Sequence, residues 1–258
     1  MQIYGRRTDM VQTRTDARLQ SGIIEQDFDR LFRYMRSKRF RNGEDTGGEP
    51  ANYIYAYHPE QELDVERRIP LLVNRLQSMD PVDSADTAPA VLVINIYEFA
   101  IDFMKKNDVF DAAIEQEPDM HGEEDTENDN DGIAAASSWP RLQDDDFYQA
   151  LAGMLGPDND DFKAALKERY EQAAANNEAD LVFFTGVGQV YPYIRTHALL
   201  NSIQDIVRSS TPVVVFFPGT YKKTASTVSV MRLFNTLDAD NYYRAFSLNT
   251  AIMEGARA

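Results

Sequence analysis

Apolar residues along this chain fall into short continuous runs and into positions spaced as on a helix. The continuous runs at Tyr53–Tyr57, Ala90–Tyr97, Asp180–Thr185 and Thr211–Phe217 predict strands, because such runs are typical of strands buried on both faces of a parallel sheet. Tyr242–Leu248 predicts a last strand. Turn or helix signals separate these segments, so each is expected to form a strand of its own.

Helically spaced apolar residues fill most of the intervals between these runs. The first stretch predicts a helix over residues 23–41 with one apolar face. The second predicts a helix over about residues 60–79, in which Pro70 marks either a kink or a new start. Further helices are predicted at about residues 98–116, 144–155, 160–176, 191–208 and 227–237. The inward-facing residues expected in the first two helices are Ile24, Phe28, Leu31, Phe32 and Met35, and then Leu63, Ile69, Leu72, Val73 and Leu76.

Strands that alternate with helices predict an α/β fold with a mostly parallel central sheet of about five strands. Helices are expected on both faces, which gives a three-layer, Rossmann-like or P-loop-like arrangement without nucleotide motifs. Residues 23–250 are interpreted as a single domain, between a flexible extension at 1–22 and a tail at 251–258. The stretch at about 117–140 contains GEEDTENDNDG and predicts a disordered acidic insertion.

Charge and composition narrow the class of protein. The 258 residues include no cysteine and carry a net charge of -16, which disfavours disulfides, thiolate metal sites and non-specific binding to nucleic acid or anionic membrane. Residues 1–41 hold ten basic and five acidic side chains and are the one basic region. Asp exceeds Glu by 26 to 16 and Arg exceeds Lys by 19 to 7, which favours a halophilic source, for example a haloarchaeon, over an ordinary acidic protein. No signal peptide or membrane span is recognised, so a cytoplasmic location without membrane contact is expected.

Two glycine turns are predicted at the ends of buried strands, Thr185-Gly-Val-Gly188 and Pro218-Gly219. Ligands of open parallel sheets bind beyond the carboxyl ends of the strands, so these turns form a candidate anion-binding or partner-binding site. Under the other interpretation, the glycines only permit tight turns. The candidate site residues are Thr185, Gly186, Gly188, Tyr191, Arg195, Pro218, Gly219, Tyr221, Lys222 and Arg244.

Neither turn completes a nucleotide fingerprint. The first has G-x-G, but Tyr191 occupies the place of the third glycine, and the second has no glycine before Lys222. Arg195 belongs either to a solvated helix face or to an anion contact. Arg244 belongs either to an internal ion pair or to a site at the end of a strand.

No catalytic or metal-binding set emerges from the remaining residues. The histidines lack metal-ligand spacing, Asp129-Asn-Asp-Gly132 only approaches a calcium-loop pattern, and no nucleophile motif is present. We therefore expect no metal, no cofactor and no catalytic residue.

A candidate basic interaction surface, for nucleic acid or an acidic partner, lies at the end of the first predicted helix, although cations there also suit a helix dipole. Its residues are Arg33, Arg36, Lys38, Arg39 and Arg41.

The order of five motifs resembles the BrxB family of BREX anti-phage defence systems. They are Tyr55-Ala-Tyr-His-Pro59 with Glu62, the strand Val93–Phe99, Thr185–Arg195 running into His197–Asn201, Val214–Tyr221, and Asn241–Phe246. The resemblance covers about residues 23–249. The N-terminal extension and the acidic insertion depart from the family pattern.

The resemblance implies a role in a complex. BrxB-like proteins are encoded beside a DNA methyltransferase, an alkaline-phosphatase-like PglZ protein and a large ATPase, and the machine marks host DNA and blocks phage replication. The family member is expected to be a non-catalytic subunit with the PglZ-like protein as its direct partner, and to meet DNA only through the complex. The alternative is a nucleotide- or phosphate-binding α/β enzyme that uses the Gly186–Gly188 and Gly219 turns.

Overall fold

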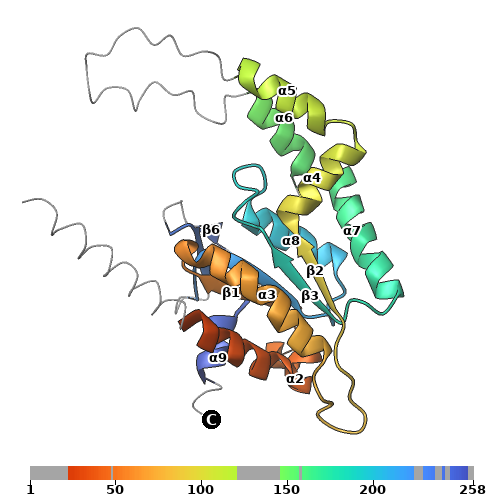
Figure 1. The fold of residues 1–258 in the computed structure, drawn as a ribbon, viewed down its shortest axis with the longest axis vertical. Coiled ribbons are helices and arrows are strands. Elements are labelled where there is room, and N and C mark those ends of the chain that lie inside the picture. Colours follow the sequence, from red (N-terminus) through yellow and green to blue (C-terminus); the bar gives the residue numbers. More distant parts are fainter. Residues whose placement is uncertain are drawn as a thin grey trace, which may run out of the picture.

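A parallel sheet forms the centre of the molecule, with its strands in the order β2-β3-β4-β1-β7 (Figure 1). The computed structural model describes residues 23–47, 49–120, 146–156, 159–223, 229–235, 240–241 and 245–254. The strands are β1 Asn52–Tyr57, β2 Val91–Asn95, β3 Leu181–Thr185, β4 Val213–Lys223, β5 Ser229–Leu233, β6 Asp240–Asn241 and β7 Phe246–Ser247. All neighbours along the order above pair in parallel. The predicted α/β fold with a mostly parallel sheet of about five strands is therefore confirmed.

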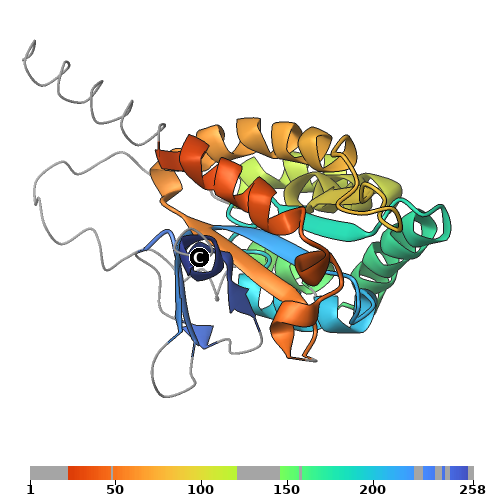
Figure 2. The same cartoon turned by 90° about the horizontal axis from the view of Figure 1, so that it is seen from below.

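Helices cover both faces of this sheet. Residues 23–35, α3 and α9 contribute to the apolar core on one face, and α4, α7 and α8 contribute to the core on the other. Figure 2 shows residues 23–35 and α3 running together over the first face. The remaining elements are α2 Lys38–Arg41, η1 Glu44–Thr46, η2 Pro59–Gln61, α3 Glu62–Gln77, α4 Ile96–Lys106, α5 Phe110–Met120, α6 Asp146–Leu155, α7 Asp160–Ala175, α8 Thr196–Ile206 and α9 Leu248–Glu254.

The first predicted helix is divided into two. Residues 23–35 are helical and bury the expected face, but the helix does not continue to Arg41. Ser37 lies between the two helical pieces, and its Oγ accepts a hydrogen bond from the Phe40 N–H at 3.2 Å. A side chain that caps a helix start in this way favours a new helix over continuation of the old one, so α2 is a separate short helix.

Helix α3 differs from the prediction at its first turn. Leu63, expected to face inward, is exposed, and Val65 is buried in its place. Pro70 lies inside a continuous helix and is exposed. The solvent-facing position lets the proline ring stand clear of the core, although the helix loses one backbone hydrogen bond there.

The run Ala90–Tyr97 is shorter as a strand than predicted. Strand β2 ends at Asn95, whose side chain accepts hydrogen bonds from the N–H groups of Tyr97 and Glu98 and begins α4. Strand β2 lies at one end of the sheet order, and its Val93 is 37% exposed. The expectation that this strand is buried on both faces is therefore wrong at Val93, although Val91, Leu92 and Ile94 are buried.

Two predicted helices have different bounds. The single helix expected at 98–116 is two helices, α4 and α5, which are separated at Asp108 by a left-handed φ of 58°. α5 continues to Met120 and therefore includes the first residues assigned to the acidic insertion. Helix α7 keeps its predicted bounds to within one residue, and Asn159 caps its start. Helix α8 begins at Thr196, and the residues before it form turns.

The largest correction concerns Pro218-Gly219, which is not a turn. Strand β4 continues through both residues to Lys223 and leaves the parallel sheet to pair with β5 in an antiparallel manner, Gly219 opposite Leu233. The helix predicted at 227–237 is wrong, since residues 229–233 form β5. In β5 the buried Met231 and Leu233 flank the exposed Arg232, an alternation with the period of a strand.

The C-terminal strand is also shorter than predicted. Its described part is β7, after which α9 runs to Glu254, into the stretch expected to be a tail. Arg244, the extension at 1–22 and residues 121–140 of the predicted insertion lie outside the described residues. None of the described helices is both long and apolar enough to cross a membrane.

Candidate functional site

The two glycine segments lie side by side at the carboxyl end of the sheet. Strands β3 and β4 are parallel neighbours, with Phe184 opposite Val215. A Cβ atom placed on Gly188 would lie 2.7 Å from Pro218 Cγ and 3.1 Å from the Phe234 ring. The structure therefore brings together the two segments that the sequence places at consecutive strand ends.

Protein atoms fill the space in front of each of these glycines. Gly186 has a φ of 70°, and a Cβ on it would overlap Asn95 Oδ1. A Cβ on Gly219 would overlap the backbone oxygen of Arg232 on the paired strand β5. Close packing in the direction of a Cβ atom explains the absence of side chains at Gly186, Gly188 and Gly219.

The other predicted site residues lie on separate elements. Tyr191 is 38% exposed and rests edge-on against Phe234. Arg195 is exposed and directly precedes α8, and Lys222 is exposed on the antiparallel part of β4. Tyr221 is buried and donates a hydrogen bond from its hydroxyl to the Ala245 carbonyl oxygen at 2.7 Å. Of this set, the structure joins Gly188, Pro218 and Tyr191, whereas Tyr221 serves the core.

Carboxylates that the sequence interpretation did not include lie at the same end of the sheet. Gln189 donates a hydrogen bond from Nε2 to Glu66 Oε1 at 2.7 Å, which connects the loop after β3 to α3. Burial, with repulsion from Glu66, raises the pKa of Glu62. Burial and the same two carboxylates raise the pKa of Tyr57, at the end of β1. The negative charge around these residues disfavours a bound phosphate.

The candidate basic surface is largely neutralised by aspartates. Lys38 Nζ lies 2.7 Å from Asp83 Oδ1, and Arg39 is paired with Asp45. Arg41 Nη2 lies 2.7 Å from Asp86 Oδ2. The side chain of Arg33 donates to the backbone oxygen of Asp29, and the backbone oxygen of Arg36 accepts from Arg41. This cluster ties α2 to the loop before β2, and paired cations are poorly suited to phosphate contacts.

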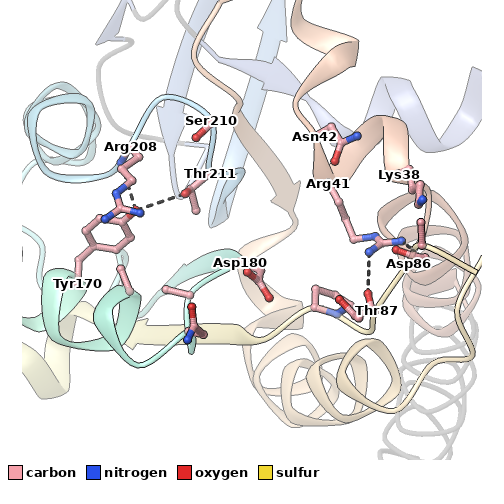
Figure 3. Close-up of a pocket in the computed structure, with 15 residues that line it drawn as sticks. Lys38, Arg41, Asn42, Asp86, Thr87, Tyr170, Asp180, Arg208, Ser210 and Thr211 are labelled. Atoms are coloured by element: carbon pink, nitrogen blue, oxygen red, sulfur yellow. Dashed lines mark hydrogen bonds and ion pairs between the residues drawn. The ribbon is translucent and has the colours of Figure 1, made fainter.

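A cavity of about 480 Å³ lies at the opposite, amino-terminal end of the sheet (Figure 3). Figure 3 shows Arg41 with its partners on one side and Arg208 beside Tyr170 on the other, with Asp180 between them. The Tyr170 hydroxyl accepts a hydrogen bond from the Arg208 N–H at 3.3 Å and lies 3.3 Å from Thr211 Oγ1. These contacts bind the start of β4 to α7, so we interpret the lining as structural.

No group of three or more histidine, aspartate or glutamate side chains suited to a metal ion occurs within the described ranges. The part of the chain that the structure describes thus offers a folded surface at the carboxyl end of the sheet, with apolar and acidic side chains. The residues that the sequence alone did not single out are Asn95, Glu66 and Gln189. The sequence gives little indication of these residues, because Gln189 and Glu66, which bond to each other, are 123 positions apart in the chain.

Comparison with known proteins assigns this chain to a family. A family model described as "BREX protein BrxB" matches residues 92–248, more than half of the chain. The chain belongs to the BrxB family. The matched region includes four of the five motifs on which the resemblance rests, namely Val93–Phe99, Thr185–Arg195 with His197–Asn201, Val214–Tyr221 and Asn241–Phe246. Membership in a family of BREX components implies a role in phage defence.

Two relatives extend over nearly the whole chain. One from Bacillus cereus (strain H3081.97), named BREX protein BrxB, is 28% identical over 225 residues, which is 87% of this chain and 97% of the relative. Another from Escherichia coli O9:H4 (strain HS), with the same name, is 25% identical over 227 residues, 88% of this chain and 92% of the relative. No solved structure matches this chain.

Proposed function

We propose that this chain is a non-catalytic adaptor subunit of a BREX phage-defence complex. In this proposal it binds the PglZ-like component, is needed for host DNA methylation and phage exclusion, and meets DNA only through the complex. Membership in the BrxB family, over most of the length of the two relatives, supports a BREX role. Family membership alone does not distinguish an adaptor role from a catalytic one.

The observation that carries the proposal is the packed carboxyl end of the sheet. Enzymes of this fold class place substrates beyond that end. Here Asn95, Pro218 and the Arg232 backbone pack against the glycines, and Gln189 of the loop after β3 bonds to Glu66, which lies near Glu62. The alternative of a nucleotide- or phosphate-binding enzyme at these glycines therefore meets carboxylates where a phosphate needs positive charge.

Co-purification tests this role directly. The tagged full chain would be expressed with the PglZ-like protein of its own locus and recovered at the salt concentration of the native cytoplasm. We expect a stable complex at fixed stoichiometry, and we expect deletion of the gene to abolish both host methylation and phage exclusion. Recovery of the chain alone, with every other component of the locus tested in turn, would contradict the adaptor role.

Calorimetry provides the complementary test of the enzyme alternative. The chain would be titrated with a panel of nucleoside triphosphates and with inorganic phosphate. The adaptor proposal predicts no saturable heat. Saturable binding that Arg195→Ala weakens would instead support the enzyme alternative.

A further inference from the structure

Four exposed apolar side chains lie on β2 or just beyond the carboxyl ends of β1, β2 and β3. Leu63 is 66% exposed, Tyr97 is 44% exposed, Tyr191 is 38% exposed and Val93 is 37% exposed. Leu63 lies in the first turn of the helix after β1, Tyr97 in the first turn after β2, and Tyr191 in the loop after β3. Single exposed apolar residues are ordinary, but several that adjoin one another mark an interaction surface.

Hydrogen bonds and packing contacts link the loops and helices that carry these side chains. Asn95 Oδ1 accepts from the Tyr97 N–H at 3.0 Å and packs against Gly186. Gln189, two residues before Tyr191, bonds to Glu66, which is one helical turn after Leu63. Figure 1 shows the amino ends of α3 and α4 and the loop after β3 at the same end of the sheet. We call this the carboxyl-end surface, made of Leu63, Val93, Tyr97 and Tyr191 with Glu62, Glu66 and Glu98.

The three carboxylates of this surface lack cationic partners. None of Glu62, Glu66 and Glu98 forms an ion pair with a residue that the structure describes. Elsewhere the fold does supply such partners, as where Arg68 lies 3.8 Å from Glu25 and Arg75 lies 2.6 Å from Asp29. Glu62 is half-buried, and burial together with Glu66 raises its pKa. Charges held close together without neutralisation destabilise the free chain, and cations from a partner would relieve that cost.

We propose that the carboxyl-end surface docks a protein segment with an apolar or aromatic side chain flanked by lysine or arginine. Because β3 and β4 separate the ends of β1 and β2, successive apolar side chains of the segment pack on Leu63, Tyr191 and Tyr97, and its cations meet Glu62, Glu66 and Glu98. This inference rests on the proposed adaptor function and identifies the face that serves it. Aromatic side chains at the centre with charges at the rim are the usual anatomy of a protein interface.

Charge also argues against other occupants of this surface. A nucleic acid would bring phosphates against three unpaired carboxylates. A second copy of this chain carries a net charge of -16, and three of its cations near the amino terminus, Lys38, Arg39 and Arg41, are already paired with aspartates. A basic segment of another protein is the occupant that complements both the apolar centre and the acidic rim.

Two leucines on one helix provide a matched test. Leu63 and Leu71 both lie on α3 and are 66% and 61% exposed, but Leu71 is not part of the carboxyl-end surface. The affinity of the full chain for the PglZ-like protein of its locus would be measured for Leu63→Ala and Leu71→Ala. We expect Leu63→Ala to weaken binding about tenfold and Leu71→Ala to leave it unchanged. Equal effects of the two variants would overturn the assignment of this face.

Glu62→Gln separates a docking role from a structural one. Because the fold raises the pKa of Glu62, removal of its charge is expected to raise the Tm of the free chain at neutral pH. The same variant is expected to weaken the complex several-fold and to flatten its salt dependence. Glu115→Gln, an exposed glutamate on α5, is the control. A Glu62→Gln chain that binds as tightly as the wild type would contradict the proposed rim.

The outcomes distinguish this inference from the adaptor function. If the wild-type chain binds its partner and Leu63→Ala and Glu62→Gln bind equally well, the carboxyl-end surface is not the docking face and the adaptor function stands. If the wild-type chain binds no component of its locus, the adaptor function itself fails. Light scattering of the chain alone is expected to give a monomer. A dimer that Leu63→Ala dissociates would show that a second copy occupies the surface and would overturn the proposed partner chemistry.

Discussion

Individual side chains decide what the glycine segments do. Thr185-Gly-Val-Gly188 suggests an incomplete phosphate loop when only the motif is considered. In the structure a side chain at Gly186 would overlap Asn95, and one at Gly188 would meet Pro218. The glycines therefore allow the ends of β2, β3 and β4 to pack closely.

A methyl group at Gly219 tests this packing. Gly219→Ala would drive its Cβ into the Arg232 backbone on β5, so we expect a loss of about 1–3 kcal/mol in the free energy of unfolding. Gly153→Ala in α6 has no atom within 4 Å of the added carbon and serves as the control. Urea denaturation measures both. Equal stability of the two variants would show that β4 and β5 do not approach as described.

The ion pair between Arg41 and Asp86 predicts a pH dependence. The hydrogen bond from Arg41, followed by that from the Val82 N–H, holds the pKa of Asp86 well below its ordinary value. The unfolded chain therefore takes up a proton at a higher pH than the folded chain does, so the stabilisation is present at neutral pH and is lost as the pH falls below about 4. We expect Asp86→Asn to lower the Tm at pH 7.

The difference between the Asp86→Asn and wild-type chains should narrow as the pH falls below about 4, since the unfolded wild-type chain then takes up a proton that the folded chain does not yet bind. Asp111→Asn, an exposed aspartate on α5, is the matched control and should leave the Tm at pH 7 unchanged. A wild-type to Asp86→Asn difference that stays constant from pH 7 to pH 3 would contradict this account of the ion pair.

At the level of elements, continuous apolar runs were the most reliable guide. Strands β1 and β3 lie within the predicted runs to within a residue, because both are central and buried. Bounds set by side-chain capping were missed, as at Ser37 and Asn95, since a cap overrides an apolar pattern that continues past it. Strand β5 was missed because Ser, Thr and Val between residues 225 and 230 suit either a helix or a strand.

The candidate site was predictable only in part. Parallel order places consecutive strand ends together, so the proximity of Gly188 and Pro218 followed from the sequence. The acidic rim did not, because it depends on the tertiary contact between Gln189 and Glu66. The outward position of Leu63 could have been found, because Val65, Ile69, Leu72 and Leu76 recur at helical spacing and Leu63 falls off that face.

Pro70 provides a test of α3 as an element. A proline inside a helix removes one backbone hydrogen bond, and Pro70 is exposed, so its ring contributes little to the core. We expect Pro70→Ala to stabilise the chain by about 1–3 kcal/mol and to leave partner affinity unchanged. A less stable Pro70→Ala chain would show that the proline supports a contact or a bend that the continuous helix does not reveal.

At the scale of the whole molecule, charge is distributed unevenly over two ends of the fold. Arginines and aspartates near α2 and the loop before β2 neutralise one another, whereas Glu62 and Glu66 at the carboxyl end of the sheet form no ion pair with any residue that the structure describes. The net charge of -16 and the preference for Asp over Glu show that carboxylates outnumber cations in the chain as a whole. A chain with such an acidic surface is most stable when added salt screens the repulsion between its carboxylates.

Salt titration tests the halophilic interpretation. We expect the Tm of the chain to rise steadily as KCl increases from about 0.1 M to molar concentrations, beyond the point at which long-range repulsion is already screened. A Tm that levels off by about 0.3 M would be consistent with simple screening of an ordinary acidic protein and would contradict adaptation to high salt.

The central claim is that this member of the BrxB family acts as an adaptor within a BREX complex. The most direct measurement is recovery of the tagged full chain with the PglZ-like protein of its own locus at native salt, compared with Leu63→Ala and Leu71→Ala. The account predicts a complex that Leu63→Ala weakens and Leu71→Ala preserves. A wild-type chain that emerges alone, with no component of its locus bound, would contradict it.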